Sequence, residues 1–151
     1  MAQPMHANVM RANPSWVDAI LDWRWTWPLA RVLLASAYLV GGLTKLFNFP
    51  DAVAEQAHFG INPPALFAVL TIVAQLVGSA LVISGRALWL GAGALAVFTA
   101  LATLIAHAFW NMEGHERFLA TNAFFEHLGL IAGFVIAALF SACERRRERP
   151  Q

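Results

Sequence analysis

Ionisable side chains that could do chemistry lie inside segments of this chain that are otherwise almost entirely apolar. Lys45 ends one such segment, His107 lies near the end of another, and Glu126 and His127 open a third. Within a membrane an ionisable group is unfavourable unless it faces protein or water, so each of the four is a candidate site residue. Glu126 is the leading candidate, because a carboxylate one turn into an apolar helix has to pair with Lys45 or His107, or become neutral.

Three kinds of ligand suit these residue types. His107, Glu126 and His127 could ligate a metal ion, but adjacent residues do not both point inward and no HxxxH or ExxH spacing is present, so we predict no metal site. A b-type haem needs two histidines that face each other across helices, and the only such pair on the outer side is His107 with His127. A quinone headgroup is chemically simpler, because its carbonyl oxygens need donors such as Lys45, His107 and Tyr38 and its ring needs an apolar wall. No Ser/His/Asp set or phosphate-binding loop is present, so the sequence makes no prediction of catalysis.

Four long apolar segments must position these side chains. A helix that crosses the hydrocarbon core of a bilayer needs about 20 apolar residues. The chain is 59% hydrophobic and only 13% charged, and its charges collect at the ends of the apolar segments. We therefore predict an all-α fold, an integral membrane four-helix transmembrane bundle within residues 28–143. The predicted spans are about 28–47, 65–84, 87–109 and 123–142.

The basic residues predict which side of the membrane each connection occupies. Arginines precede the first span, lie in the second connection and follow the fourth span, whereas the first connection contains neither Lys nor Arg. Because basic residues are enriched on the cytoplasmic side, we predict that both termini are cytoplasmic and that the first and third connections are outside. This orientation brings the candidate residues to the same outer side of the bundle. They are Lys45, His107, Glu126 and His127.

The segments that flank the bundle are short. Residues 1–27 are predicted to be a cytoplasmic N-terminal segment, and residues 144–151 a basic cytoplasmic tail. Within the first of these, apolar and aromatic residues repeat at helical spacing, which predicts an interfacial amphipathic helix or, alternatively, an aromatic belt at the entry of the first span. The residues in this pattern are Trp16, Ile20, Trp23 and Trp27.

A polar pocket at the outer side is the simplest arrangement for these residues. Tyr38 shares one face of the first span with Lys45, and Gln75 lies on a face of small and polar residues in the second span. We predict that Tyr38 and Gln75 form the floor of the pocket, and that residues 48–64 hold a short helix over its mouth. The small and polar face of the fourth span consists of Asn122, Glu126, Gly129, Gly133, Ala137 and Ser141.

Several of these residues have a structural alternative. Lys45 could extend to the lipid headgroups, and His107 could be a hydrogen-bonded core histidine. His127 lies about 100° around the helix from Glu126, so it could face headgroups or another helix. Arg31 lies close to the inner interface and is predicted to be an anchor or a structural ion-pair partner.

The motifs resemble those of the DoxX family of small membrane proteins. The resemblance covers about residues 29–140, and the segments that carry it are RVLLASAYLVGGLTKLFNF, HFGINPPAL, TIVAQLVGSALVISGR, FTALATLIAHAFW and FFEHLGLIAGF. It implies a four-helix fold in a bacterial-type inner membrane. The family includes a subunit of a thiosulfate:quinone oxidoreductase and members thought to work beside redox enzymes.

The candidate residues match the family pattern only in part. Arg31 and Lys45 carry over by position. Gln75 stands where the family often has Glu, and the pair Glu126–His127 stands where it often has Lys-Asn. The chemistry of the family is therefore not transferred to these positions.

Taken together, these features predict a multi-pass membrane protein that binds a lipophilic redox ligand such as a quinone within a membrane redox assembly. Its partners would be the lipid bilayer and either a redox enzyme or a second copy of the chain. The alternative is a non-catalytic scaffold or partner subunit whose polar residues only pack the bundle. A small-solute transporter is a weaker alternative, because four short helices leave little room for alternating access. The net charge of +1 gives no reason to expect binding to nucleic acid.

Overall fold

The four predicted spans are four long helices in the structure, a computed structural model that describes residues 13–147. These helices are α2 (Thr26–Phe47), α4 (Pro64–Ser84), α5 (Leu88–Ala106) and α6 (Gly114–Arg147). Each is long and apolar enough to cross a membrane, and no strand occurs among residues 13–147. The prediction of an all-α transmembrane bundle is confirmed.

Three shorter elements lie outside the spans: α1 (Ser15–Leu21), α3 (Phe49–His58) and the 3-10 helix η1 (Phe109–Asn111). The helix predicted before the first span is therefore present, although it ends before Trp23. A helix is also present in the first connection, as the sequence predicted. Residues 1–12 of the predicted N-terminal segment and residues 148–151 of the predicted basic tail lie outside the described part of the chain.

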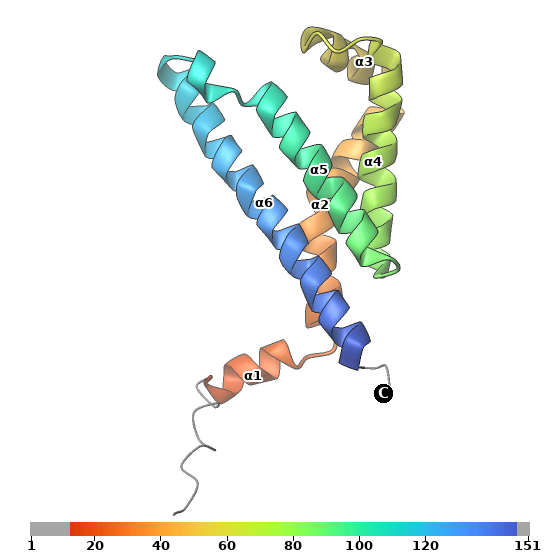
Figure 1. The fold of residues 1–151 in the computed structure, drawn as a ribbon, viewed down its shortest axis with the longest axis vertical. Coiled ribbons are helices and arrows are strands. Elements are labelled where there is room, and N and C mark those ends of the chain that lie inside the picture. The colour runs from red at the N-terminus through yellow and green to blue at the C-terminus, as the bar shows by residue number, and fades with distance from the viewer. Residues whose placement is uncertain (1–12, 148–151) are drawn as a thin grey trace, which may run out of the picture.

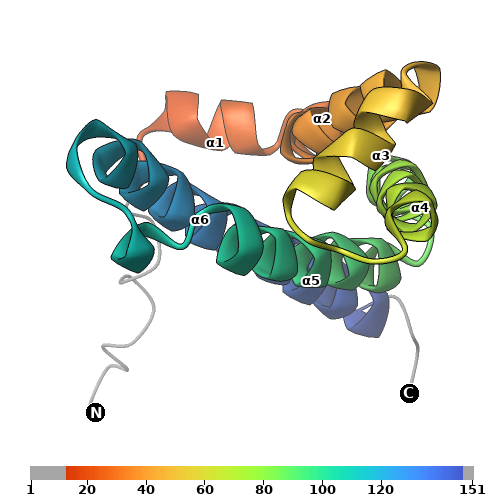
Figure 2. The same cartoon turned by 90° about the horizontal axis from the view of Figure 1, so that it is seen from above.

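The two ends of the bundle are distinct (Figure 1). The α3 end carries α3 and the α5–α6 connection, and the α1 end carries α1, the α4–α5 connection and the last turns of α6. Seen from above, α3 lies across the ends of α2 and α4, while α5 and α6 run side by side (Figure 2). The connections thus divide between the two ends as the predicted spans require.

The last helix is longer than the sequence predicted. At 1.5 Å per residue the 34 residues of α6 extend for about 51 Å, compared with about 30 Å for the hydrocarbon core of a bilayer. The predicted span of 123–142 lies within this helix, which begins at Gly114 and continues through Arg147. Apolar length locates only the part in the membrane, whereas residues such as Glu116 and Arg145 are polar but form helices readily.

Glycines set the closest approach of two helices, α4 and α5. A Cβ atom at Gly91 would lie 2.8 Å from the carbonyl oxygen of Gly78, and one at Gly78 would lie 2.8 Å from the Leu95 side chain. Side chains larger than hydrogen at these positions would push the helices apart, as is typical of small residues between membrane helices. From this crossing, near the α1 end, α4 and α5 separate toward the α3 end (Figure 1).

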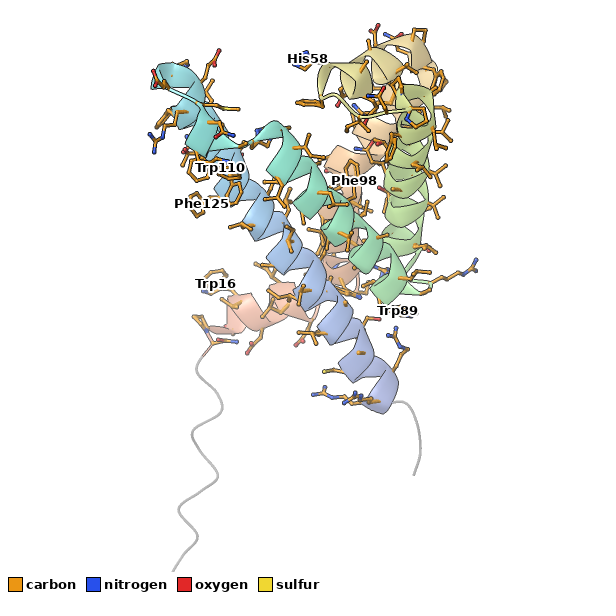
Figure 3. The ribbon with its side chains drawn as sticks, turned by 45° about the horizontal axis from the view of Figure 1, so that its top comes forward. Trp16, His58, Trp89, Phe98, Trp110 and Phe125 are labelled. Atoms are coloured by element: carbon orange, nitrogen blue, oxygen red, sulfur yellow. The ribbon has the colours of Figure 1, made fainter. Side chains whose placement is uncertain are left out.

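The outer surface of the bundle is apolar along its whole length. Leu33, Val40 and Ile136 are 73%, 63% and 65% exposed, and similar residues cover every long helix. An exposed apolar surface of this size is incompatible with water but is the surface that lipid requires. Figure 3 shows Trp89 at the first turn of α5 and Trp110 just beyond its other end, where aromatic residues suit the two membrane interfaces.

Candidate functional site

A cavity of about 700 Å³ lies at the α3 end, between the pair α2–α4 and the pair α5–α6, with α3 also on its wall. This volume falls within the range of about 300–1,000 Å³ that is typical of small-molecule sites. Most of the wall is apolar. The charged and larger polar side chains on the wall include Tyr38, Lys45, Glu55, Gln75, His107 and His127. The structure therefore brings together every predicted ligand-binding residue except Glu126.

The cavity is open on its apolar side. Leu70 of α4 and Val97 and Leu101 of α5 line it, and they are 50%, 61% and 57% exposed. The helices α4 and α5 separate toward the α3 end (Figure 1), which agrees with the exposure of these side chains. A molecule with an apolar tail can therefore occupy the cavity and extend into the bilayer.

Tyr38 lies deep on the cavity wall and is only 6% exposed. Its ring packs edge-on against Phe134, with 5.4 Å between the ring centroids, and against Phe98, which Figure 3 shows directed from α5 into the bundle. The Tyr38 hydroxyl is 2.5 Å from the Thr99 hydroxyl, and Thr99 donates to the Leu95 carbonyl oxygen at 2.6 Å. Tyr38 therefore joins α2 to α5 through a buried hydrogen bond.

His127 of α6 forms a second hydrogen bond between helices, with Thr103 of α5. Its Nδ1 lies 2.7 Å from the Thr103 hydroxyl, which donates to the Thr99 carbonyl oxygen at 2.6 Å. The His127 ring also meets the His107 ring edge-on, with 5.1 Å between the centroids. The sequence left open whether His127 faces headgroups or another helix, and in the structure it faces α5 and the cavity.

Gln75 of α4 is the polar residue on the cavity wall that most clearly lacks a partner. The side chain is 8% exposed, and its Oε1 atom is buried without any hydrogen bond from residues 13–147. Gly41 of α2 lies beside it, and a Cβ atom there would be at an ordinary contact distance of 3.5 Å from Gln75 Nε2. A buried amide oxygen without a donor is unfavourable by roughly 1–3 kcal/mol, so this position favours a bound donor.

Lys45 and Glu55 form an ion pair at the mouth of the cavity. Lys45 lies in the last turn of α2, and Glu55 lies in α3. This ion pair is the only salt bridge among residues 13–147. The sequence allows Lys45 to pair with Glu126 or to extend to the headgroups. In the structure its partner is Glu55 and not Glu126, because α3 folds back over the cavity and places its carboxylate beside the ammonium group.

Glu126 does not line the cavity, which corrects its place as the leading site candidate. The residue is exposed, as is its neighbour Phe125, which lies on the outer side of α6 (Figure 3). The face of α6 that meets the cavity is instead the one that carries His127 and Leu130.

Arg31 lies at the α1 end, away from the cavity. Its guanidinium group lies against Gly85, where α4 ends, and its Cζ atom is 5.8 Å from the centroid of the Trp27 ring. No ion pair of Arg31 is formed with a residue from 13 to 147, so the predicted structural ion pair is not present in that part of the chain. The location of Arg31 away from the cavity agrees with the predicted role of an anchor and not with a role in ligand binding.

By residue type alone, His107, Glu126 and His127 could bind a metal ion, and His107 with His127 could bind a haem. Within residues 13–147 no group of three His, Cys, Asp or Glu side chains is close enough to hold a metal ion. His107 and His127 are in edge contact on the same wall rather than facing each other across an open space, so they do not form a pair of axial haem ligands.

Three residues of the site were missed by the sequence interpretation or not assigned to it. Thr99 and Thr103 lie four residues apart on α5, and each anchors a polar side chain from another helix. Their i, i+4 spacing on one helix face was the signal available. The sequence pattern did not single out Glu55, because its role depends on the path of α3.

The fold and the cavity define a small multi-pass integral membrane protein with four spanning helices. The chain belongs to the DoxX family, whose sequence profile matches residues 26–108. This region includes Tyr38, Lys45, Gln75 and His107 but ends before α6, so His127 lies beyond it.

One relative of known location is similar over most of its length. The chain is 24% identical over 115 residues to inner membrane protein YphA of Escherichia coli (strain K12), which covers 74% of this chain and 79% of the relative. No solved structure matches the chain.

Proposed function

We propose that this chain is an inner-membrane protein that binds a lipophilic molecule with an oxygen-bearing ring headgroup, of the quinone class, in the cavity at the α3 end. The observation that carries the proposal is Gln75, a buried amide without a partner on the wall of a cavity of about 700 Å³. A ligand hydroxyl group of the reduced, hydroquinone form would donate to this Oε1 atom, and the Gln75 Nε2 group can donate to a carbonyl oxygen of the oxidised form.

The distribution of polar and apolar groups supports a ligand of this shape. Tyr38, Gln75, His107 and His127 line the cavity below the ion pair at its mouth, while most of the remaining wall is apolar and open toward the bilayer. A ring headgroup fits the polar part, and an isoprenoid or alkyl tail fits the open apolar part. Because quinones carry electrons between membrane enzymes, a redox enzyme is the proposed protein partner.

Filling the cavity tests the proposal without changing a polar group. Ala74 lines the cavity on α4, whereas Ala80 lies on an exposed face of the same helix. The protein, in lipid nanodiscs, is incubated with a short-tailed ubiquinone and examined by native mass spectrometry. We expect the wild type and Ala80→Phe to retain one bound quinone, and Ala74→Phe and Gln75→Leu to lose it. Equal retention by Ala74→Phe and Ala80→Phe would show that the quinone does not occupy this cavity.

A scaffold that docks a partner helix is the second candidate function. Gly93 and Gly129 have no atom within 4 Å of an added Cβ, and α5 and α6 form a groove of about 240 Å³ on another face. Small residues that no helix of the chain covers suit close approach by another membrane helix. For this function, Gly93→Leu would dissociate an oligomer in native mass spectra, whereas Leu104→Phe on the same helix would not.

A further inference from the structure

The hydroxyl groups of Thr99 and Thr103 have fixed hydrogen-bond directions. Each lies 2.6 Å from a backbone carbonyl oxygen one turn earlier, Leu95 for the first and Thr99 for the second. A carbonyl oxygen cannot donate, and a hydroxyl has one hydrogen. At 2.6 Å the two oxygens would repel each other unless the hydroxyl donated, so both threonines use their only hydrogen on the backbone.

The partners of these threonines must therefore be donors. The Tyr38 hydroxyl donates to Thr99 Oγ1 at 2.5 Å, because the Thr99 hydrogen is already used. For the same reason His127 Nδ1 donates to Thr103 Oγ1 at 2.7 Å. The hydrogen bond at one ring nitrogen determines the tautomer of a neutral histidine, so His127 carries its hydrogen on Nδ1.

The two side chains that these threonines hold on the cavity wall, Tyr38 and His127, are consequently acceptors toward a ligand. The oxygen of Tyr38 has a lone pair free but no hydrogen to give, and neutral His127 has a bare Nε2, which makes no hydrogen bond within residues 13–147. At the mouth, Lys45 uses one of its three hydrogens on Glu55, whose carboxylate adds a further acceptor beside the remaining ammonium hydrogens. Gln75 can present either its oxygen or its nitrogen and adapts to both kinds of ligand.

We infer that this cavity selects a ligand that donates hydrogen bonds through hydroxyl groups, such as a hydroquinone, over the matching quinone, which can only accept them. The inference rests on the proposed function, since it concerns the same cavity. It is carried by the backbone anchoring of Thr99 and Thr103, which fixes Tyr38 and His127 as acceptors toward the ligand. A site whose polar groups match the ligand rejects an analogue that lacks the matching hydrogen, because the acceptors are then left unpaired.

Binding of a matched pair of ligands tests the selection. Affinities for a short-tailed ubiquinol and the corresponding ubiquinone are measured anaerobically in nanodiscs at about pH 8, where an unperturbed histidine is neutral. We expect the quinol to bind at least tenfold more tightly. Equal affinities, or tighter binding of the quinone, would overturn the inference and leave the proposed function intact. If neither ligand binds, the proposed function fails and the inference fails with it.

The tautomer of His127 gives a readout that needs no ligand. In protein labelled with 15N-histidine, we expect the His127 spectrum to show a protonated Nδ1 and a bare Nε2, the signal being assigned by its loss in His127→Gln. Thr103→Ser keeps the hydroxyl and should keep both the tautomer and the ligand preference. Thr103→Val removes the hydroxyl group and should reduce the preference for the quinol over the quinone severalfold. A hydrogen on Nε2 in the wild type would contradict the inference even if a quinone binds.

Discussion

Lys45 in the last turn of α2 pairs with Glu55 in α3, the helix that follows it in the chain. The pair fastens α3 across the mouth of the cavity, since both side chains lie on the cavity wall. Apart from this pair, α3 is held by packing against α4 and by the buried Ala52 and Gln56. The position of the helix therefore depends in part on one partly exposed ion pair.

Breaking this pair should loosen α3 without unfolding the bundle. The two side chains are 21% and 43% exposed, so Glu55→Gln should lower the free energy of unfolding by less than about 1 kcal/mol. We expect backbone amides of residues 49–58 to exchange hydrogen faster, as measured by mass spectrometry in nanodiscs. Glu116→Gln, in the first turn of α6, removes an exposed carboxylate that forms no salt bridge with residues 13–147, and this control should leave the exchange of residues 49–58 unchanged. An unaltered rate in Glu55→Gln would mean that packing alone positions the helix.

Two glycines on α5 should respond oppositely to the same substitution. Gly91→Ala adds a methyl group 2.8 Å from the Gly78 carbonyl oxygen and 2.7 Å from Leu81 Cβ, so overpacking should lower the stability by about 1–3 kcal/mol. Gly93→Ala meets nothing within 4 Å, and alanine favours a helix by about 0.5–1 kcal/mol over glycine. Unfolding in SDS mixed micelles measures both. A tolerant Gly91→Ala would contradict the close crossing of α4 and α5.

The hydrogen bond between Tyr38 and Thr99 can be tested by a double-mutant cycle. Tyr38→Phe removes the donor and should lower the stability by about 0.5–1.5 kcal/mol. Thr99→Val leaves a buried tyrosine hydroxyl without its acceptor and should lower it more, by about 1–3 kcal/mol. The double variant should lose less than the sum of the two. Strict additivity would show that the two hydroxyls do not interact.

The connection between α4 and α5 contains two residues with positive φ, and substitutions at these two positions should have opposite effects on stability. Gly85 has φ of +73°, so Gly85→Ala should lower the stability by about 1–2 kcal/mol, and its methyl group would also displace the Arg31 guanidinium. Ala87 has φ of +48°, so Ala87→Gly should relieve strain and raise the stability by up to about 1 kcal/mol. Thermal unfolding in nanodiscs measures both. A loss of stability in Ala87→Gly would refute this explanation.

The spans were predictable because apolar length is a direct consequence of the thickness of the bilayer. The same reasoning missed the ends of α6, since Glu116 and Arg145 continue the helix where the apolar segment stops. The pairing of Lys45 with Glu55 was not predictable, because it depends on how α3 folds back after Asn48.

The choice between Glu126 and His127 shows why the site was only partly predictable. The sequence places Glu126 on the same small-residue face of the fourth span as Gly129, Gly133 and Ala137. Ala137 is buried and Gly133 lies beside Leu34, but a Cβ atom at Gly129 would meet no atom within 4 Å. At the α3 end it is therefore the adjacent face, with His127, that meets the cavity.

The half-exposed Leu70, Val97 and Leu101 on the cavity wall have a consequence for how the site is completed. Where α4 and α5 have separated, the polypeptide leaves a stretch of wall to be supplied by the acyl chains of neighbouring lipids. The shape of the site is then a joint property of the chain and its surrounding lipid. Replacing bilayer by detergent would exchange one part of that wall, so the length and saturation of the acyl chains should alter ligand affinity even though no residue has changed.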